Sequence, residues 1–446
     1  MNKQRFLNGL FLLGATTGLI LPALINGYPL VYADTSTYLA SGFTMQPPFD
    51  RPMTYGLFVR LFSLNGLSLW PVIAVQSLLL SWLIFQITRE LMPAKQNKDF
   101  SSFVIVLILS LFAGVSWVSS QIMPDIFTSI MVLSALLILT RQNSKSRQVF
   151  LYVVFFFSCA MHVSHLAIGF TLLAGILIIR QIKLPDLKRI IKIRPVVVLS
   201  LLVLLSIITM GSALSKSKHV FFMGALVEHG IAKKYLDRNC KETQYALCAY
   251  KDSLPPLAWQ FIWEESSPFY KVGGWKGTKA EFNEIIRGTL TSPRFMGMHV
   301  AESLKATFRQ LTKFDVGDGA GAFPAGTLLH ERIVKYLPQE QESYENSLQN
   351  REKLIFKREY NIIQRIVILI SIVMLIVLPV ANKEWNPDKL FIMGILILWA
   401  VVVNAWVCGT FAGAIDRLGS KMIWFIPWLA ILFLLQKLRK TALPER

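Results

Sequence analysis

Long uncharged apolar runs dominate the hydrophobic pattern of this chain. Phe6–Ile25, Val196–Leu214 and Leu390–Cys408 are examples, and none of them contains a charged residue. A helix rises about 1.5 Å per residue, so about 20 residues cross a hydrocarbon layer about 30 Å thick. The pattern therefore predicts about ten membrane-spanning helices, at residues 6–25, 69–87, 101–120, 126–140, 148–162, 165–180, 196–214, 361–381, 388–409 and 421–437.

The composition supports this interpretation. Of the 446 residues, 53% are hydrophobic and only 16% are charged, and the mean hydropathy is +0.48. In soluble domains about a quarter of the residues are charged, so the fold class predicted is an all-α polytopic membrane protein. The formal net charge of +19 is typical of a nucleic-acid-binding protein only until the basic residues are placed along the chain.

Most basic residues fall in alternate short connectors between the apolar runs. This asymmetry is the positive-inside rule; it predicts both ends in the cytoplasm and makes nucleic acid an improbable partner. The other side has only Arg51, Arg60, Arg417 and Lys421 in its short connectors. The connectors assigned to the cytoplasm hold Lys3, Arg5, Arg89, Lys95, Lys98, Arg141, Lys145, Arg147, Arg180, Lys183, Lys188, Arg189, Lys192, Arg194, Lys383, Lys389, Lys437, Arg439, Lys440 and Arg446.

The first apolar run is long for a signal-peptide core, and no small-x-small cleavage site follows it. We therefore expect a retained first helix and a multi-pass protein of a bacterial inner membrane, part of the cell envelope. Three parts are predicted: a transmembrane module at 1–214, a mostly helical extracytoplasmic insert at 215–360, and C-terminal transmembrane helices at 361–446. The module contains a long first outer loop at 26–68, which we expect to include short surface helices.

Two acidic residues lie at the outer ends of predicted helices. Asp34 follows the first helix, and Asp125 is the only charge between two apolar runs. Partial desolvation at that depth would raise the pKa of Asp34 and make it a better base. The alternative for both is an N-cap: Asp34 precedes the predicted surface helix Thr35–Ser41, and Asp125 precedes the fourth spanning helix.

Three basic residues stand on the outer side against the statistical trend. Arg51, Arg417 and Lys421 in that position suit a phosphate of the outer leaflet. The alternative is local pairing, of Arg51 with its neighbour Asp50 and of Arg417 with its neighbour Asp416, together with ordinary interfacial anchoring.

Other polar features have weaker implications. His162 and His165 have a spacing that would put both on one helical face, either as metal ligands or as satisfied polar residues at a helix break. The segment Val316–Gly326 is rich in glycine but lacks a P-loop ending, and predicts a flexible loop that drapes over a site. Cys240 and Cys248 lie together in the polar insert, either as a disulfide or as two free thiols.

Taken together, these residues resemble the GT-C superfamily of membrane glycosyltransferases, which use polyprenyl-phosphate-linked sugars, the aminoarabinose transferases and protein mannosyltransferases among them. The resemblance is one of layout and covers about the first 180 residues, together with the short motif before the last helix. Its motifs are Ala33–Tyr38, Pro47–Phe58, the helix start at Ser68–Pro71, Met123–Phe127 and Asp416–Lys421.

The resemblance implies a reaction at the extracytoplasmic face with inversion at the sugar. Asp34 would be the general base, Asp125 would position the acceptor or assist, and Arg417, Arg51 or Lys421 would stabilise the departing phosphate. The first loop lacks Asp-x-Asp, so a divalent metal cofactor is not supported. The partners implied are membrane lipid, the polyprenyl-phosphate sugar donor and a glycan, lipid or protein acceptor; further substrate contacts would come from Tyr38, His162 and His165.

Three other functional classes compete with this hypothesis. A transporter or flippase for a lipid-linked substrate would place charges inside the helices along a path, whereas here they lie at helix ends, and we find no internal repeat. A polysaccharide polymerase or ligase shares the large late outer loop and the basic residues. A receptor or scaffold would bind a partner through the insert, but that gives no reason for Asp34 and Asp125 to flank the mouth of the bundle.

Overall fold

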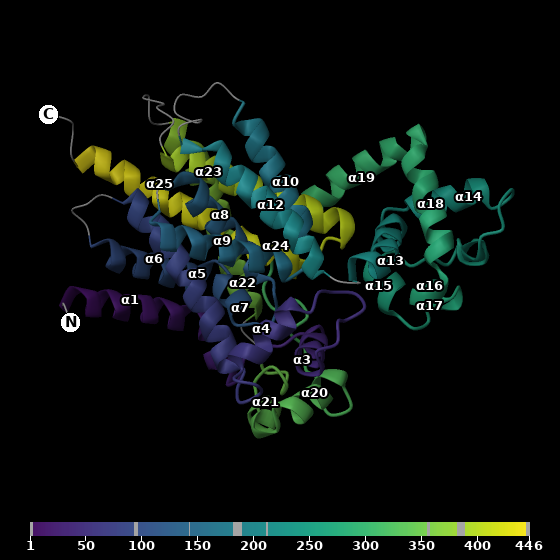
Figure 1. Ribbon diagram of the computed structural model, residues 1–446, viewed down its shortest axis with the longest axis horizontal. Coiled ribbons are helices and arrows are strands. Elements are labelled where there is room, and N and C mark those ends of the chain that lie inside the picture. Colours follow the sequence, from purple (N-terminus) through teal and green to yellow (C-terminus); the bar gives the residue numbers. More distant parts are fainter. Residues whose placement is uncertain are drawn as a thin grey trace.

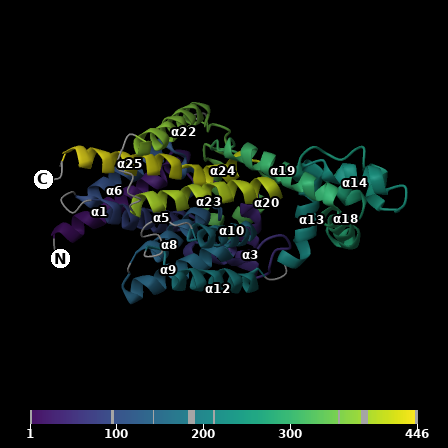
Figure 2. The ribbon, with the colours of Figure 1, turned by 90° about the horizontal axis from the view of Figure 1, so that it is seen from above.

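The protein is all-helical in the part of the chain that the computed structural model describes, which comprises residues 3–92, 97–141, 143–181, 190–210, 213–354, 357–380 and 389–442. The extended pairing in these residues is a single bridge between Leu30 and Gln121. Figures 1 and 2 show a bundle of long helices with a smaller helical body projecting from one end. The all-α class predicted from the apolar runs is confirmed.

Each of the ten apolar stretches predicted to be helical is mostly helical where it is described. Helix α1 begins and α25 ends at the same end of the bundle, as Figures 1 and 2 show. The helices of the bundle are α1 (Lys3–Leu19), α2 (Leu21–Asn26), α5 (Trp70–Leu91), α6 (Lys98–Phe112), α7 (Val115–Ser119), α8 (Ile126–Thr140), α9 (Lys145–Ala160), α10 (Val163–Ile179), α12 (Ile193–Thr209), α22 (Lys357–Val380), α23 (Lys389–Phe411), α24 (Asp416–Ile423) and α25 (Phe425–Ala442).

Four of these helical segments are long and apolar enough to cross a membrane. They are Trp70–Leu91, Lys357–Leu378, Lys389–Phe411 and Asp416–Leu438, the last of which joins α24 and α25. Shorter apolar helices are α8, α10 and α12. The prediction of about ten spans is therefore supported only as far as four helices that are long and apolar enough to cross a membrane, which indicates a membrane protein.

Two of the predicted spans are interrupted for identifiable reasons. The first run breaks at Ile20, where Pro22 occupies the second position of α2 and has no amide hydrogen to continue the ladder. The third run breaks after Ala113, where Gly114 adopts a φ of +77° and occupies the N-cap position of α7. A side chain at Gly114 would also meet the amide of Gln364 at 2.7 Å. An apolar run alone does not reveal such breaks.

The first loop, residues 26–68, contains two short helices. Helix α3 (Thr35–Thr44) includes the predicted surface helix Thr35–Ser41, and α4 (Thr54–Phe62) packs directly against it. The close approach depends on glycine, because a Cβ at Gly42 would lie 2.2 Å from the carbonyl oxygen of Gly56.

The insert is mostly helical, as predicted, and packs in two places. Its first part has a hydrophobic core of its own, which includes Val220, Phe261 and Phe282, and forms the projecting body of Figure 1. The helices of the insert are α13 (Ala213–Glu228), α14 (Ile231–Asn239), η1 (Ala246–Tyr250), α15 (Ala258–Trp263), α16 (Pro268–Lys271), α17 (Gly274–Gly277), α18 (Lys279–Thr291), α19 (Pro293–Leu311), α20 (Leu328–Tyr336), η2 (Pro338–Glu340) and α21 (Gln341–Glu345).

The second part of the insert, residues 312–354, packs on the first loop. The Glu340 carboxylate accepts hydrogen bonds from the Tyr28 hydroxyl (2.8 Å), the Ser68 hydroxyl (2.6 Å) and the Leu69 amide (3.2 Å). The Gln349 side chain hydrogen-bonds both the amide and the carbonyl of Val31. Because these donors and acceptors are buried, they fix the first loop against a segment about three hundred residues later in the chain.

Some predictions lie outside the described residues. They are the ends of predicted helices at 211–212, 381 and 388, and the predicted cytoplasmic residues Lys95, Lys183, Lys188, Arg189, Lys383 and Arg446.

Candidate functional site

Charged residues from the first loop and the last helices meet in one cluster. Arg51 Nη1 lies 2.9 Å from Asp34 Oδ1, and Arg417 Nη1 lies 3.5 Å from Asp34 Oδ2. Arg417 also lies 3.6 Å from Asp125 Oδ2, and Lys421 Nζ lies 3.7 Å from Asp125 Oδ1. We call these five residues the ion-pair cluster. The sequence predicted each as a candidate, and the structure brings all five together.

The cluster is largely removed from solvent. Lys421 is 1% exposed and Asp125 9%, whereas Asp34 retains 27% of its side-chain exposure. Buried charges are stable only when they are paired, and here each carboxylate faces two cations. Asp34 is the acidic group through which the cluster reaches the surface.

Helix capping does not account for the two aspartates. Asp34 and Asp125 occupy the N-cap positions of α3 and α8, but neither side chain makes a capping hydrogen bond. Both residues have helical backbone angles, so their carboxylates point away from the first turn and toward the basic residues. The N-cap alternative therefore fails for their side chains.

Local pairing explains the basic residues only in part. Arg51 does bond its neighbour, with Nε donating to Asp50 Oδ2 at 2.9 Å, but it also contacts Asp34. Asp416 does not pair with Arg417; it accepts the Asp315 amide at 3.0 Å and lies 3.8 Å from Lys313. Arg417 is thereby left for the two aspartates of the cluster.

Two residues that the sequence did not single out hold Arg417 in place. The Arg417 guanidinium lies over the Tyr32 ring, 4.2 Å from its centroid, and Asp318 Oδ2 accepts the Arg417 backbone amide at 3.2 Å. Asp318 belongs to the glycine-rich segment 316–326, which packs on Tyr32 at Gly319; a Cβ there would lie 1.6 Å from the ring. The segment thus reaches the cluster through Asp318 and Gly319.

Several buried polar atoms at this place have no hydrogen-bond partner among the described residues, although the charged groups among them form ion pairs. They are the Tyr38 hydroxyl, Arg51 Nη1, Asp125 Oδ2 and Arg417 Nε. Tyr38 is fully buried, and Arg51 lies over its ring at 5.4 Å from the centroid. Buried polar groups are normally hydrogen-bonded, so this concentration of unused donors and acceptors marks a place where a polar ligand would be satisfied.

The electrostatics of Asp34 differ from the sequence-based prediction. Burial does raise the pKa of its carboxyl, but the Arg51 and Arg417 guanidinium groups lower it further, and the net pKa lies below the ordinary value of 3.8. The expectation of a raised pKa is therefore wrong, because neither Arg51 nor Arg417 could be placed beside Asp34 from sequence. Burial raises the pKa of the Tyr38 phenol, which keeps this hydroxyl protonated.

The two histidines lie outside the ion pairs. His162 caps α10, with Nδ1 accepting the Ser164 amide at 3.2 Å. His165 is buried between the Thr128 hydroxyl (2.8 Å) and the Ser158 carbonyl (2.7 Å). They satisfy the alternative of polar residues at a helix break, and the described residues contain no group of three or more candidate metal ligands.

The cysteines divide as their positions suggest. Cys240 and Cys248 are joined in a disulfide between α14 and η1, which is the bridged form of the two alternatives left open by the sequence. Cys159 and Cys408 are buried free thiols of the bundle.

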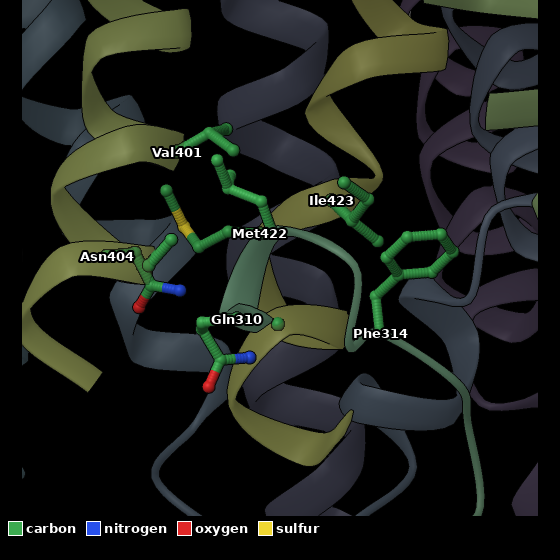
Figure 3. A pocket seen from close by; sticks show the side chains of 9 residues that line it. Gln310, Phe314, Val401, Asn404, Met422 and Ile423 are labelled. Carbon is green, nitrogen blue, oxygen red and sulfur yellow. The ribbon is translucent and has the colours of Figure 1, made fainter. Parts of the chain in front are cut away.

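A small pocket lies against the other side of α24. Figure 3 shows Gln310 and Asn404 beside Val401, Met422 and Ile423, with Phe314 at the edge. The Gln310 amide donates to the Ile415 carbonyl and the Asn404 amide donates to the Leu418 carbonyl, both at the start of α24. The polar groups of this pocket therefore fix α24, the helix that carries Arg417 and Lys421.

Comparison with known proteins gives no assignment: no family model matches the chain, and neither a curated protein nor a solved structure resembles it significantly.

The residues that sequence reasoning missed are Tyr32, Asp318 and Glu340. Asp318 had a signal, since it stands between Gly317 and Gly319. Tyr32 and Glu340 had none, because their importance lies in contacts with distant segments.

Proposed function

We propose that this protein is a membrane glycosyltransferase that moves a sugar from a polyprenyl-phosphate carrier to an acceptor at the extracytoplasmic face. The observation that carries the proposal is the ion-pair cluster, in which a part-exposed carboxylate lies between two arginines. The remaining predicted spans, the N-in and C-in orientation and the GT-C fold belong to the same proposal. The clustering of the motifs that carry the GT-C resemblance supports it.

The arginines would bind the phosphate of the donor. Arg51 and Arg417 present planar guanidinium groups, which match phosphate oxygens in a bidentate manner. Arg417 Nε has no hydrogen-bond partner among the described residues, so a phosphate would satisfy it without breaking an existing hydrogen bond. Arg51 Nη1, 2.9 Å from Asp34 Oδ1, would exchange that contact for the phosphate. Lys421, deeper in the cluster, would add charge at a fixed point beside Asp125.

Asp34 would act as the general base. The acceptor O–H or N–H loses its proton to the Asp34 carboxylate while its oxygen or nitrogen forms a bond to the anomeric carbon. The bond from that carbon to the phosphate oxygen breaks, and the electron pair leaves with the phosphate. The donor diester, with one negative charge, becomes a phosphate monoester with two, and the two arginines stabilise the added charge.

Phosphate binding would also change the basicity of Asp34. In the unliganded protein the arginines lower the pKa of its carboxyl. When they turn toward a phosphate, their effect on Asp34 weakens while its burial persists, so the pKa of Asp34 rises. The base would become effective only when the donor is bound.

The test compares two aspartate variants of the full-length protein. Asp34→Asn removes the proposed base, and Asp99→Asn is the matched control, because Asp99 is also a buried carboxylate paired with an arginine, Arg89, outside the cluster. Both proteins are purified in detergent, checked for folding by size-exclusion chromatography, and given radiolabelled polyprenyl-phosphate sugars with a native lipid extract.

We expect transfer of label by the wild type and by Asp99→Asn, and a loss of about a hundredfold or more in Asp34→Asn. Equal transfer by Asp34→Asn would refute its role as base while leaving the enzyme class intact. Failure of the wild type with every donor would refute the glycosyltransferase, and uptake of an unaltered lipid-linked sugar across vesicles would then identify a transporter.

A further inference from the structure

One face of α19 carries a row of exposed apolar side chains. Val300, Leu304 and Phe308 are 58%, 56% and 71% exposed, and their four-residue spacing places them on one side of the helix. Ala306 and Gln310, on the other side, are buried. A water-facing helix normally has polar residues on its exposed side, so this row requires a partner that is itself apolar.

The position of α19 indicates what that partner is. The Ser303 hydroxyl lies 2.9 Å from the Thr410 hydroxyl, near the end of α23, whereas Leu311 lines the same small pocket as Val401, nine positions earlier in α23. The two helices therefore run antiparallel, and the second half of α19 lies alongside α23, one of the four helices able to cross a membrane. Figure 1 shows α19 leading from the projecting body back to the bundle.

The charges beside the apolar row fit a phospholipid surface. Lys305 and Arg309 directly follow Leu304 and Phe308, and their side chains are 63% and 55% exposed. Both are near Glu302, at 2.7 Å and 3.8 Å. A helix with an apolar face bordered by exposed cations is typical of interfacial helices, in which the cations reach lipid phosphates.

We infer that α19 enters the membrane alongside α23 and exposes its apolar face to lipid. Its Val300–Leu304–Phe308 face lies among the acyl chains of the leaflet nearest the projecting body, and Lys305 and Arg309 contact the phosphate headgroups. The inference rests on the packing of α19 against a membrane-spanning helix and does not depend on the proposed enzymatic activity. It places a helix of the predicted soluble insert in the bilayer.

The test measures the surroundings of each position with a spin label. Val300→Cys, Leu304→Cys and Phe308→Cys are introduced singly into the full chain, with Asn283→Cys, an exposed position on α18, as the matched control. The proteins are labelled and reconstituted into vesicles of phosphatidylethanolamine and phosphatidylglycerol. Collision rates with oxygen, which concentrates in lipid, and with a water-soluble nickel chelate are then compared; the unmutated chain, whose free cysteines are buried, controls for background labelling.

We expect the ratio of oxygen to nickel collisions to be several-fold higher at the three α19 positions than at 283. A ratio equal to that at 283 would overturn the inference, because the face would then be in water. Low collision rates with both reagents at all three positions would overturn it as well, because the face would then be covered by protein.

Discussion

Replacing Asp125 by Asn should destabilise the protein through a single buried residue, Lys421. The Lys421 ammonium is 1% exposed, and Asp125 is the acidic group within 4 Å of it among the described residues. At 3.7 Å and an effective dielectric constant of about 20, the attraction between the two charges is about 4 kcal/mol. Removing one member of a buried pair leaves an uncompensated charge, so we expect a loss of about 3–5 kcal/mol in the free energy of unfolding.

The converse change should cost less. Lys421→Met removes the buried ammonium, and Asp125 keeps Arg417 at 3.6 Å. In the double variant the ammonium no longer needs a counter-charge, so Asp125→Asn should then be much less harmful. We expect a coupling free energy of about 1–3 kcal/mol between the two changes.

Unfolding in mixed micelles, induced with a denaturing detergent and followed by tryptophan fluorescence, would measure the four proteins of this cycle. Trp424 is a nearby reporter, since its indole nitrogen donates to the Ser129 hydroxyl at 3.1 Å and to the Lys421 carbonyl at 3.2 Å. If Asp125→Asn costs the same with and without Lys421, the two residues are not coupled, and the account of the cluster given above is refuted.

Three further results follow from the structure. Gly319→Ala should lower transfer activity by about tenfold or more, since the new Cβ would meet the Tyr32 ring at 1.6 Å. The control Gly321→Ala, whose Cβ has nothing within 4 Å, should keep an activity near that of the wild type. Equal activity of the two variants in the radiolabel assay would contradict this. The pKa of Asp34 is lowered on folding, so its ion pairs stabilise the protein fully above the ordinary value of 3.8 and are lost as the pH falls below it. The difference in melting temperature between wild type and Asp34→Asn should therefore shrink between about pH 7 and about pH 3. A constant difference would contradict this. Glu340→Gln should cost about 1–3 kcal/mol of stability in the same unfolding assay, since this carboxylate accepts hydrogen bonds from the Tyr28 and Ser68 hydroxyls and from the Leu69 amide. An unchanged unfolding midpoint would show that these hydrogen bonds contribute nothing.

The helices were readable from the sequence because the bilayer imposes a simple requirement on length and apolarity. The prediction of a continuous helix over 101–120 was wrong, because the break at Gly114 depends on a left-handed backbone and on the nearby Gln364. The full length of the spans was also overestimated, because a run such as Phe6–Ile25 contains Pro22, which ends one helix and begins another.

The residues of the candidate site could be predicted from the sequence, but the contacts between them could not. Asp34, Arg51, Arg417 and Lys421 stood out because charges are scarce and expensive at the membrane boundary. Which carboxylate faces which cation depends on packing, and that information lies in contacts such as the one between Asp34 and Arg417, 383 positions apart. The lowered pKa of Asp34 follows from its contacts with Arg51 and Arg417 together.

That separation also has a consequence for biosynthesis. The first loop, with Asp34 and Arg51, is made early, but Glu340 and Gln349 emerge about three hundred residues later and Arg417 later still. At an elongation rate of about 5–20 residues per second, the early loop spends on the order of tens of seconds without the groups that pair with its buried polar atoms. The site can therefore form only after Arg417 has been made, which gives quality-control proteases a long interval in which to recognise an incomplete molecule.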